Sequence, residues 1–318
     1  MRITGQLIDT TTGAHIWADR IDGSLDDVFE LQDQVASNVV GAIEPKLRLL
    51  EMKRANHKLP ANLDTYDLYL RALAQIHKMS RESWYEAIQL LRRTLQLDPT
   101  YAPAGGLFRW CRAWQQSHGW ETLSEQQIVE AVVVAKQAVD NGKYDPDVLS
   151  MAGWAISYFT GDHTACSSLI ERGLVLKTNS AVAWNARGWV LTFSARPEPA
   201  IESFERAMRL SHLDPLAYLC KAGLALAHMV ARRYSDGIDW VDQALREQPR
   251  YAAAVRYKAS LCGLLGRTDE GREWVRRMLE LYPNLTIASL ERYLTSMNVP
   301  ELAAIFLEGM RKAGLPEE

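Results

Sequence analysis

The chain of 318 residues lacks several features that mark common classes of protein. No apolar run approaches the ~20 residues that a membrane-spanning helix needs. The formal net charge of -3 is close to balance, so no basic surface indicates a nucleic acid as the main partner. The first residues contain no apolar segment of the length found in signal peptides. We therefore expect a soluble cytoplasmic protein that binds neither a membrane nor a nucleic acid.

Cysteine is scarce. The four cysteines, Cys111, Cys166, Cys220 and Cys262, lie far apart and form no CxxC pair. Each lies in or beside an apolar helical pattern, so we expect reduced thiols that serve as small core residues. Reduced cysteines agree with a cytoplasmic location.

Motifs for catalysis and metal binding are missing from the sequence. It contains no GxxxxGK[ST] phosphate loop, and its histidines show no HExxH or zinc-finger spacing. His163 follows Gly161 and Asp162 in a turn, where no oriented partner is visible that would make it a general base. We therefore expect no catalytic residue, no metal site, no cofactor and no enzymatic activity.

What the sequence does contain is a repeat. Pro215, Pro249 and Pro283 follow one another at intervals of 34 residues. This interval is the period of the tetratricopeptide repeat, a pair of antiparallel helices. The clearest copy carries the small, aromatic and proline positions of that pattern: Trp184, Gly188, Ala200, Phe204, Ala207 and Pro215. Small residues let the two helices approach closely, and the proline stops the second helix before the next begins.

Weaker copies extend the repeat in both directions. Ala87 and Leu91 mark a first copy, whose inter-helix turn we expect to be longer than usual. Residues 100–146 form a copy with a lengthened connection around His118–Ser124. A further copy ends near Asn179, and Leu285 to Leu315 reads as a terminal helix pair that caps the array.

These copies predict the fold class and its division. We expect an all-α right-handed superhelix of tetratricopeptide repeats, preceded by a small β-hairpin and a helix. The array of about six repeats covers residues 64–283, the capping helices cover 284–318, and the amino-terminal segment covers 1–58.

The amino-terminal segment begins with two predicted strands. Arg2–Asp9 and His15–Ala18 have strand-like composition and are joined by the turn-rich Thr10–Gly13, which favours a hairpin. An isolated hairpin is marginally stable, and its edges invite further strands. Those strands could lie upstream in a longer protein, or another copy of the chain or the following helix could complete the layer. Pairing through the hairpin would make a homo-oligomer.

A helix and a linker are predicted after the hairpin. Ser24 to Asp27 resembles a capping box, and apolar residues recur at helical spacing as far as Leu50. Pro45 lies inside that pattern and is expected to kink or divide the helix. The polar stretch Lys53–Asn62 is then expected to be the linker to the repeats.

Three amino-terminal runs carry a family resemblance: Ile3–Asp9 (ITGQLID), Thr12–Arg20 (TGAHIWADR) and Val28–Asp33 (VFELQD). They resemble the end of the TolB-like domain that precedes tetratricopeptide repeats in many bacterial proteins. The tail from Leu302 to Glu317 is similar to the end of members linked to class III adenylate or guanylate cyclases. The resemblance implies an upstream cyclase domain or winged-helix DNA-binding domain. A cyclase keeps its metal-binding aspartates on its own α/β domain, so we expect no cyclase activity from these residues.

The predicted binding surface is the concave groove, which the first helix of each repeat lines. Alignment of the copies places Trp110, Trp154 and Trp189 at one equivalent position facing that groove. Further residues on or near the same face are Trp114, Asn185, Phe193, Met229 and Arg256. Tryptophan and arginine are favoured anchors for a bound peptide. The alternative is that the tryptophans only close gaps between tightly wound repeats.

Three functions are consistent with these patterns. The first is a protein-interaction scaffold of a bacterial signalling protein, which binds a protein or peptide partner in its groove. The second is the carboxy-terminal part of a class III adenylate cyclase, and the third is the sensor half of a winged-helix transcriptional regulator. In each case the chain is expected to be the carboxy-terminal part of a longer protein, and Met1 is either a true start or an internal one.

Overall fold

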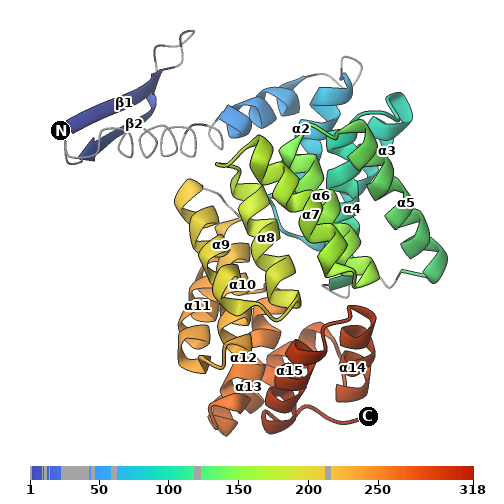
Figure 1. Cartoon of the computed structure of the whole chain (residues 1–318), viewed down its shortest axis with the longest axis vertical. Coiled ribbons are helices and arrows are strands. Elements are labelled where there is room, and N and C mark those ends of the chain that lie inside the picture. Colours follow the sequence, from blue (N-terminus) through green and yellow to red (C-terminus); the bar gives the residue numbers. More distant parts are fainter. Residues whose placement is uncertain are drawn as a thin grey trace.

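Helix pairs follow one another along most of the chain in the computed structural model (Figure 1). The structure describes residues 2–8, 10, 13, 15–22, 43, 47–58, 63–117, 123–211 and 216–318. The helices are α2 (Thr65–Ile76), α3 (Arg81–Leu97), α4 (Ala102–Ser117), α5 (Glu125–Asn141), α6 (Pro146–Thr160), α7 (His163–Leu176), α8 (Ala181–Phe193), α9 (Pro197–Leu210), α10 (Ala217–Val230), α11 (Tyr234–Glu247), α12 (Ala252–Leu264), α13 (Thr268–Leu281), α14 (Ile287–Ser296) and α15 (Pro300–Lys312).

Polar side chains and prolines set where the helices begin. Asp64, Ser80, Ser124 and Thr286 each accept a hydrogen bond from the backbone of the first turn in a capping box. Helices α6, α9 and α15 instead have proline in the first turn, where its missing N–H is not needed. The repeat boundaries are therefore encoded by local chemistry.

The helix ends agree with the predicted repeat boundaries. Pro249 follows α11 and Pro283 follows α13, each just after the residue that caps the helix. Pro215 lies outside the described residues. The connection from α4 to α5 is lengthened as predicted, because α4 ends at Ser117 and α5 begins at Glu125.

Small residues bring the helices of neighbouring pairs together around Phe204. This ring is fully buried on α9. A Cβ added at Gly188 would lie 2.7 Å from the ring, and one added at Gly223 would lie 2.3 Å from it. Glycine at both positions therefore lets α8 and α10 pack directly on the phenyl ring, which confirms the predicted role of Gly188.

The last helix pair returns to the middle of the array. The hydroxyl groups of Tyr158 on α6 and Tyr293 on α14 are 2.9 Å apart. The side-chain nitrogen of Asn298 donates to the carbonyl oxygen of Gly161 over 3.2 Å. Helices α14 and α15 therefore lie close to α6 and α7 (Figure 1). These hydrogen bonds connect two parts of the superhelix that are far apart in the sequence.

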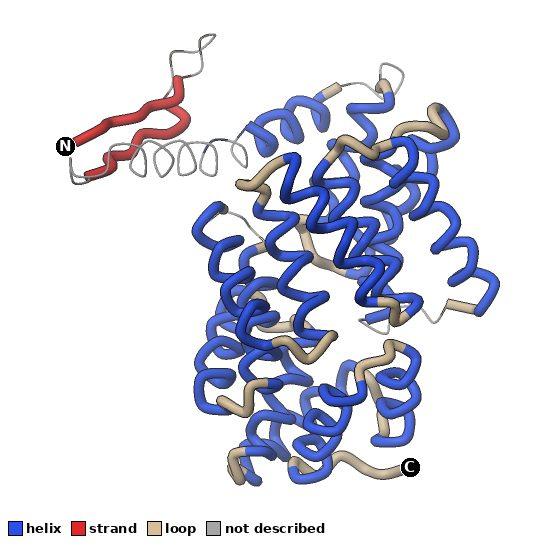
Figure 2. Tube along the Cα trace, in the orientation of Figure 1, coloured by secondary structure: helices blue, strands red, loops and turns tan. Residues whose placement is uncertain are grey.

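The amino-terminal hairpin lies away from the helical array (Figure 2). Strands β1 (Arg2–Ile8) and β2 (His15–Asp22) are antiparallel, with Arg2 opposite Asp22 and an irregularity between Leu7 and Ile8. The hairpin is as predicted, and β2 continues four residues beyond the predicted end at Ala18. No third strand pairs with it among the described residues.

The predicted linker is partly wrong. Residues 47–57 are helical, so Lys53 to His57 belong to a helix. Met52 and Ala55 bury one side of this helix against the array, and Arg71 on α2 donates from Nε to the carbonyl oxygen of Ala55 over 3.0 Å. The polar composition of the stretch concealed these two inward positions. The predicted capping box at Ser24 and the kink at Pro45 lie outside the described residues.

Candidate functional site

The tryptophans predicted to share one groove-facing position meet in one cluster with Trp114. Trp110 and Trp114 come from α4, Trp154 from α6 and Trp189 from α8. The rings of Trp114 and Trp154 are stacked, with centroids 5.6 Å apart and an interplanar angle of 18°. Trp114 also meets Trp189 edge to face at 6.4 Å, and Trp110 lies 6.4 Å from Trp154. The alignment of repeats therefore brings these residues together.

Most of these rings are covered by one another. Trp114, Trp154 and Trp189 are each 4% exposed, whereas Trp110 and Asn185 are only half-buried. The three buried indoles therefore contribute to the core, as the alternative interpretation expected of them. Trp110 and Asn185 are the two predicted groove residues that retain a substantial surface for a partner.

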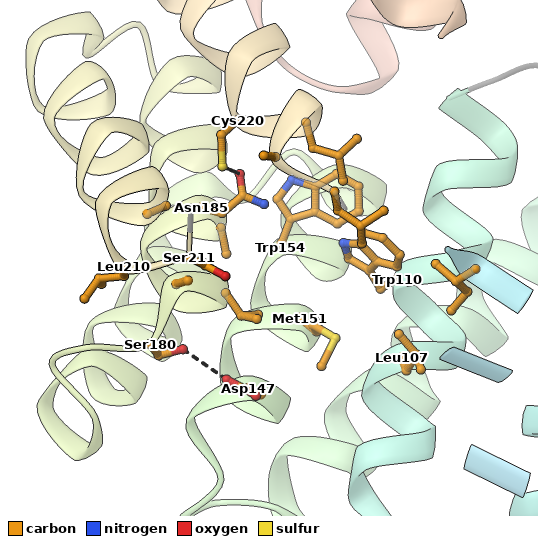
Figure 3. A pocket seen from close by; sticks show the side chains of 18 of the residues that line it. Leu107, Trp110, Asp147, Met151, Trp154, Ser180, Asn185, Leu210, Ser211 and Cys220 are labelled. Atoms are coloured by element: carbon orange, nitrogen blue, oxygen red, sulfur yellow. Dashed lines mark hydrogen bonds between the residues drawn. The ribbon is translucent and has the colours of Figure 1, made fainter. Parts of the chain in front are cut away.

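A first pocket of about 170 Å³ lies beside this cluster (Figure 3). Trp110, Trp154 and Asn185 line it together, and Figure 3 shows the Asn185 amide nitrogen directed toward the Trp154 ring. Apolar side chains, among them Leu107 and Met151, form much of the remaining wall. The pocket is therefore a mainly apolar surface with an amide at one side, the usual composition of a binding site.

Hydrogen bonds fix some of the polar groups of the first pocket. Ser180 donates to Asp147 over 3.0 Å, and Cys220 Sγ lies 3.3 Å from Asn185 Oδ1, to which it donates. The Asn185 side-chain nitrogen donates to no residue in the described part of the chain. An asparagine amide has two N–H donors, so this nitrogen is available to a ligand carbonyl.

A second pocket of about 60 Å³ shares Trp114, Trp154 and Trp189 with the first. Phe193 and Arg256, two further predicted groove residues, line it. Both pockets are thus bounded by the same three indoles.

Met229 lines neither the first nor the second pocket. It is fully buried on α10, and Ser260 Oγ lies 3.9 Å from its sulfur. Met229 was predicted to lie on the groove face, and in the structure it belongs to the core.

The second pocket contains residues that the sequence patterns did not single out. Tyr158, Tyr251, Tyr257 and Tyr293 line it, and Tyr293 comes from the helix pair interpreted only as a cap. Burial raises the pKa of Tyr158 well above its ordinary value and also raises that of Tyr293. Both phenols are therefore neutral near pH 7. The sequence pattern did not indicate these tyrosines, because the residues that surround them in the pocket come from distant repeats.

The histidine that the sequence raised as a possible general base is held by hydrogen bonds within the fold. His163 lies outside both pockets, with Nδ1 2.7 Å from Ser157 Oγ and Nε2 3.2 Å from the Asn298 carbonyl oxygen. Burial lowers its pKa below the ordinary value. Within the described residues, no group of three or more histidine, cysteine or acidic side chains could hold a metal ion. All four cysteines are buried and unlinked.

No helix in the described part of the chain is both long enough and apolar enough to cross a bilayer.

The fold and the inner pockets define a tetratricopeptide-type helical repeat protein. Superhelices of this type offer an extended concave surface to protein partners. No known protein-family profile matches the chain.

The chain is similar to one curated protein over part of its length. A protein of Rhizobium meliloti (strain 1021), named "Putative adenylate cyclase 3", is 32% identical over 146 residues. The match covers 46% of this chain and 25% of that protein, so it spans only a quarter of the relative.

Solved structures share the fold. Cut9–Hcn1, an APC/C hetero-tetramer, matches with a TM-score of 0.55 and 17% identity, over 86% of this chain and 49% of that chain. The human IFIT1 dimer with m7Gppp-AAAA matches with a TM-score of 0.58 and 11% identity, over 80% of this chain and 60% of that chain. At such identities the similarity shows the fold alone.

Proposed function

We propose that the chain is a protein-interaction scaffold that holds an extended peptide segment of a partner protein at the first pocket. The observation that carries the proposal is that Trp110 and Asn185, both half-buried, line the same pocket. The Trp110 ring offers an apolar face to a side chain of the peptide. The Asn185 N–H groups, which donate to no described residue, suit a backbone carbonyl.

Two other predicted groove residues, Trp114 and Trp154, pack against Trp110 and also line this pocket. The stacked indoles of Trp114 and Trp154 form a rigid floor, because each is held by several aromatic neighbours. A rigid floor lowers the entropy lost when a ligand binds. The proposal thus assigns contact to Trp110 and Asn185, and positioning to the buried tryptophans.

Peptide selection tests this proposal. A library of linear peptides displayed on phage is selected on the chain, and the affinity of each recovered peptide is measured by fluorescence anisotropy. We expect Trp110→Ala and Asn185→Ala to weaken binding about tenfold, as is usual for an interface anchor. Val133→Ala is the control, since Val133 is exposed on α5 and lines neither pocket. Equal binding by all three variants, or no selected peptide, would contradict the proposal.

A second proposal concerns the larger context. We propose that the chain acts as the regulatory, non-enzymatic part of a cyclase-type signalling protein in the cytoplasm, with residues 1–58 as the end of a TolB-like domain before the array at 64–283 and the cap at 284–318. The partial match to the protein named an adenylate cyclase supports this context. Within the described residues β1 and β2 pair only with each other, and their outer edges would receive strands of the same protein or of another copy.

Two measurements test the context. An immunoblot of the source cells with an antibody against the array should detect a polypeptide longer than 318 residues, whose upstream sequence distinguishes a cyclase from a winged-helix regulator. A nucleotide assay of this chain with ATP and Mg²⁺ or Mn²⁺ should give no cyclic AMP. Cyclic AMP formation by the chain alone would reverse the assignment of a non-enzymatic role.

A further inference from the structure

The second pocket contains a buried positive charge. Arg256 on α12 is 8% exposed and lines this pocket. Its Nη2 donates to the carbonyl oxygen of Ser117 over 2.8 Å, and its guanidinium carbon lies 5.7 Å from the centre of the Tyr282 ring. Ser117 ends α4, so the partial negative charge of a helix carboxyl terminus offsets part of the arginine charge.

Among the described residues, no carboxylate balances the remaining charge. The described residues that line the second pocket include no aspartate or glutamate, and Arg256 makes no ion pair with any described acidic side chain. Burial acts to lower the pKa of Arg256, and the groups that act to raise it are tyrosine phenols, which are neutral near pH 7. A buried charge without a partner is costly to the folded chain, so a bound counter-ion would stabilise this arrangement.

The polar groups of the pocket are mainly donors. A guanidinium has five N–H groups, and in the described structure Arg256 uses one of them in a hydrogen bond. Tyr158 and Tyr293 share one of their two hydroxyl protons in the bond between them, which leaves the other proton to donate. The indole N–H groups of Trp154 and Trp189 are buried with no acceptor among the described residues. A ligand that only accepts hydrogen bonds would satisfy this set.

We propose that the second pocket binds the carboxylate of an apolar organic acid, with Arg256 as the anchoring cation. The volume of this pocket is about 60 Å³, several times the roughly 10–15 Å³ that one water needs. The pocket therefore has room for a carboxylate group. The aromatic walls of Trp189, Phe193 and Tyr257 suit an apolar carbon chain beside the carboxylate. The site does not require the peptide-binding function proposed above.

Matched probes test the charge requirement on the intact chain. Isothermal titration compares 4-phenylbutyrate with 4-phenylbutanamide, which has the same apolar body and no charge. A second pair is an acetylated tetrapeptide ending in phenylalanine, with either a free carboxylate or an amide terminus. Binding of an acid together with loss of binding by its amide supports the site. The peptide pair shows whether the carboxylate belongs to a chain terminus or to a free acid. Equal binding by an acid and its amide, or binding by neither acid, overturns the proposal.

Substitution of Arg256 tests the anchor. Arg256→Lys keeps the charge but loses the planar fork, so the acid should bind about tenfold more weakly. Arg256→Met should abolish acid binding. Because Arg256→Met also removes the contact with Ser117, circular dichroism must show that it folds before its result is used. If it does not fold, Arg256→Lys and the probe pairs on the unaltered chain decide. Unchanged acid affinity in Arg256→Lys and in a folded Arg256→Met would contradict the proposal.

Discussion

The hydroxyl groups of Tyr158 and Tyr293 lie 2.9 Å apart and join α6 to α14 across 135 residues of sequence. Asn298 and His163 add hydrogen bonds between the same two regions. Neighbour-to-neighbour packing alone would leave a tetratricopeptide superhelix open. Here the terminal pair contacts the third pair, and residues of both pairs help to line the second pocket.

The tyrosine pair should contribute measurably to stability. Tyr158→Phe and Tyr293→Phe each remove one hydroxyl, and each should lower the free energy of unfolding by about 1 kcal/mol. The double variant should lose little more than either single variant, because both changes break the same bond. Urea unfolding of the four proteins measures the coupling. Tyr144→Phe, at a 76% exposed side chain, is the control and should change nothing. Fully additive losses would show that the two hydroxyls do not interact.

Substitution of a buried tryptophan should lower the free energy of unfolding more than substitution of a half-buried one. Trp154→Ala removes a buried ring that stacks on Trp114 and Tyr158, so it should cost about 3–5 kcal/mol. Trp110→Ala removes a half-buried ring and should cost clearly less. The urea midpoint of each variant, followed by circular dichroism, checks the order. A stable Trp154→Ala variant would mean that the indole is dispensable for packing.

The repeat itself could be predicted because its signals are local. Prolines 34 residues apart and small residues such as Gly188 determine where one helix ends and how closely two helices pack. The equivalent tryptophans could be placed for the same reason, since one position of the repeat always faces inward. Their exposure could not be predicted, because it depends on how tightly successive repeats curve.

The second pocket could not be predicted for the same physical reason. Its walls combine α4 and α6 with α12 and α14, and the position of α14 is the sum of small rotations over all the repeats between them. Arg256 was placed on the inner face by its repeat position, but its contact with Ser117, 139 residues away, has no local signal.

The contact at His163 should make stability depend on pH. His163 Nε2 faces the Asn298 carbonyl oxygen, so Nε2 carries the proton and Nδ1 accepts from Ser157. Burial lowers the pKa of His163 below 6.5, although nearby Asp162 acts in the opposite direction. The unfolded chain therefore binds this proton more readily than the folded chain. The stability that the neutral His163 side chain contributes is complete above about pH 6.5. It is lost as the pH falls from 6.5 through the lower pKa of His163 in the folded chain.

Removal of the imidazole tests this dependence. The free energy of unfolding of His163→Gln should fall less between pH 7 and pH 5 than that of the unaltered chain. Burial also lowers the pKa of His228, despite its contact with Asp236, so part of the slope should remain. His57→Gln is the control, because His57 is exposed and bonds only to the backbone of its own helix. If the free energy of unfolding fell equally between pH 7 and pH 5 in all three proteins, His163 would not contribute to the pH dependence of stability.

Gly223 should tolerate no side chain while Phe204 remains. A Cβ at Gly223 would lie 2.3 Å from the buried ring, so Gly223→Ala should lower the free energy of unfolding by about 1–3 kcal/mol. Phe204→Leu in the same chain should recover part of this loss, since the smaller side chain leaves room for the methyl group. Gly106→Ala is the matched control: it lies inside α4, its added Cβ would meet nothing closer than 3.6 Å, and alanine favours helix by about 1 kcal/mol. Urea unfolding of these variants distinguishes the two effects. If Gly223→Ala were as stable as Gly106→Ala, the close packing of α10 on Phe204 would not be needed for stability.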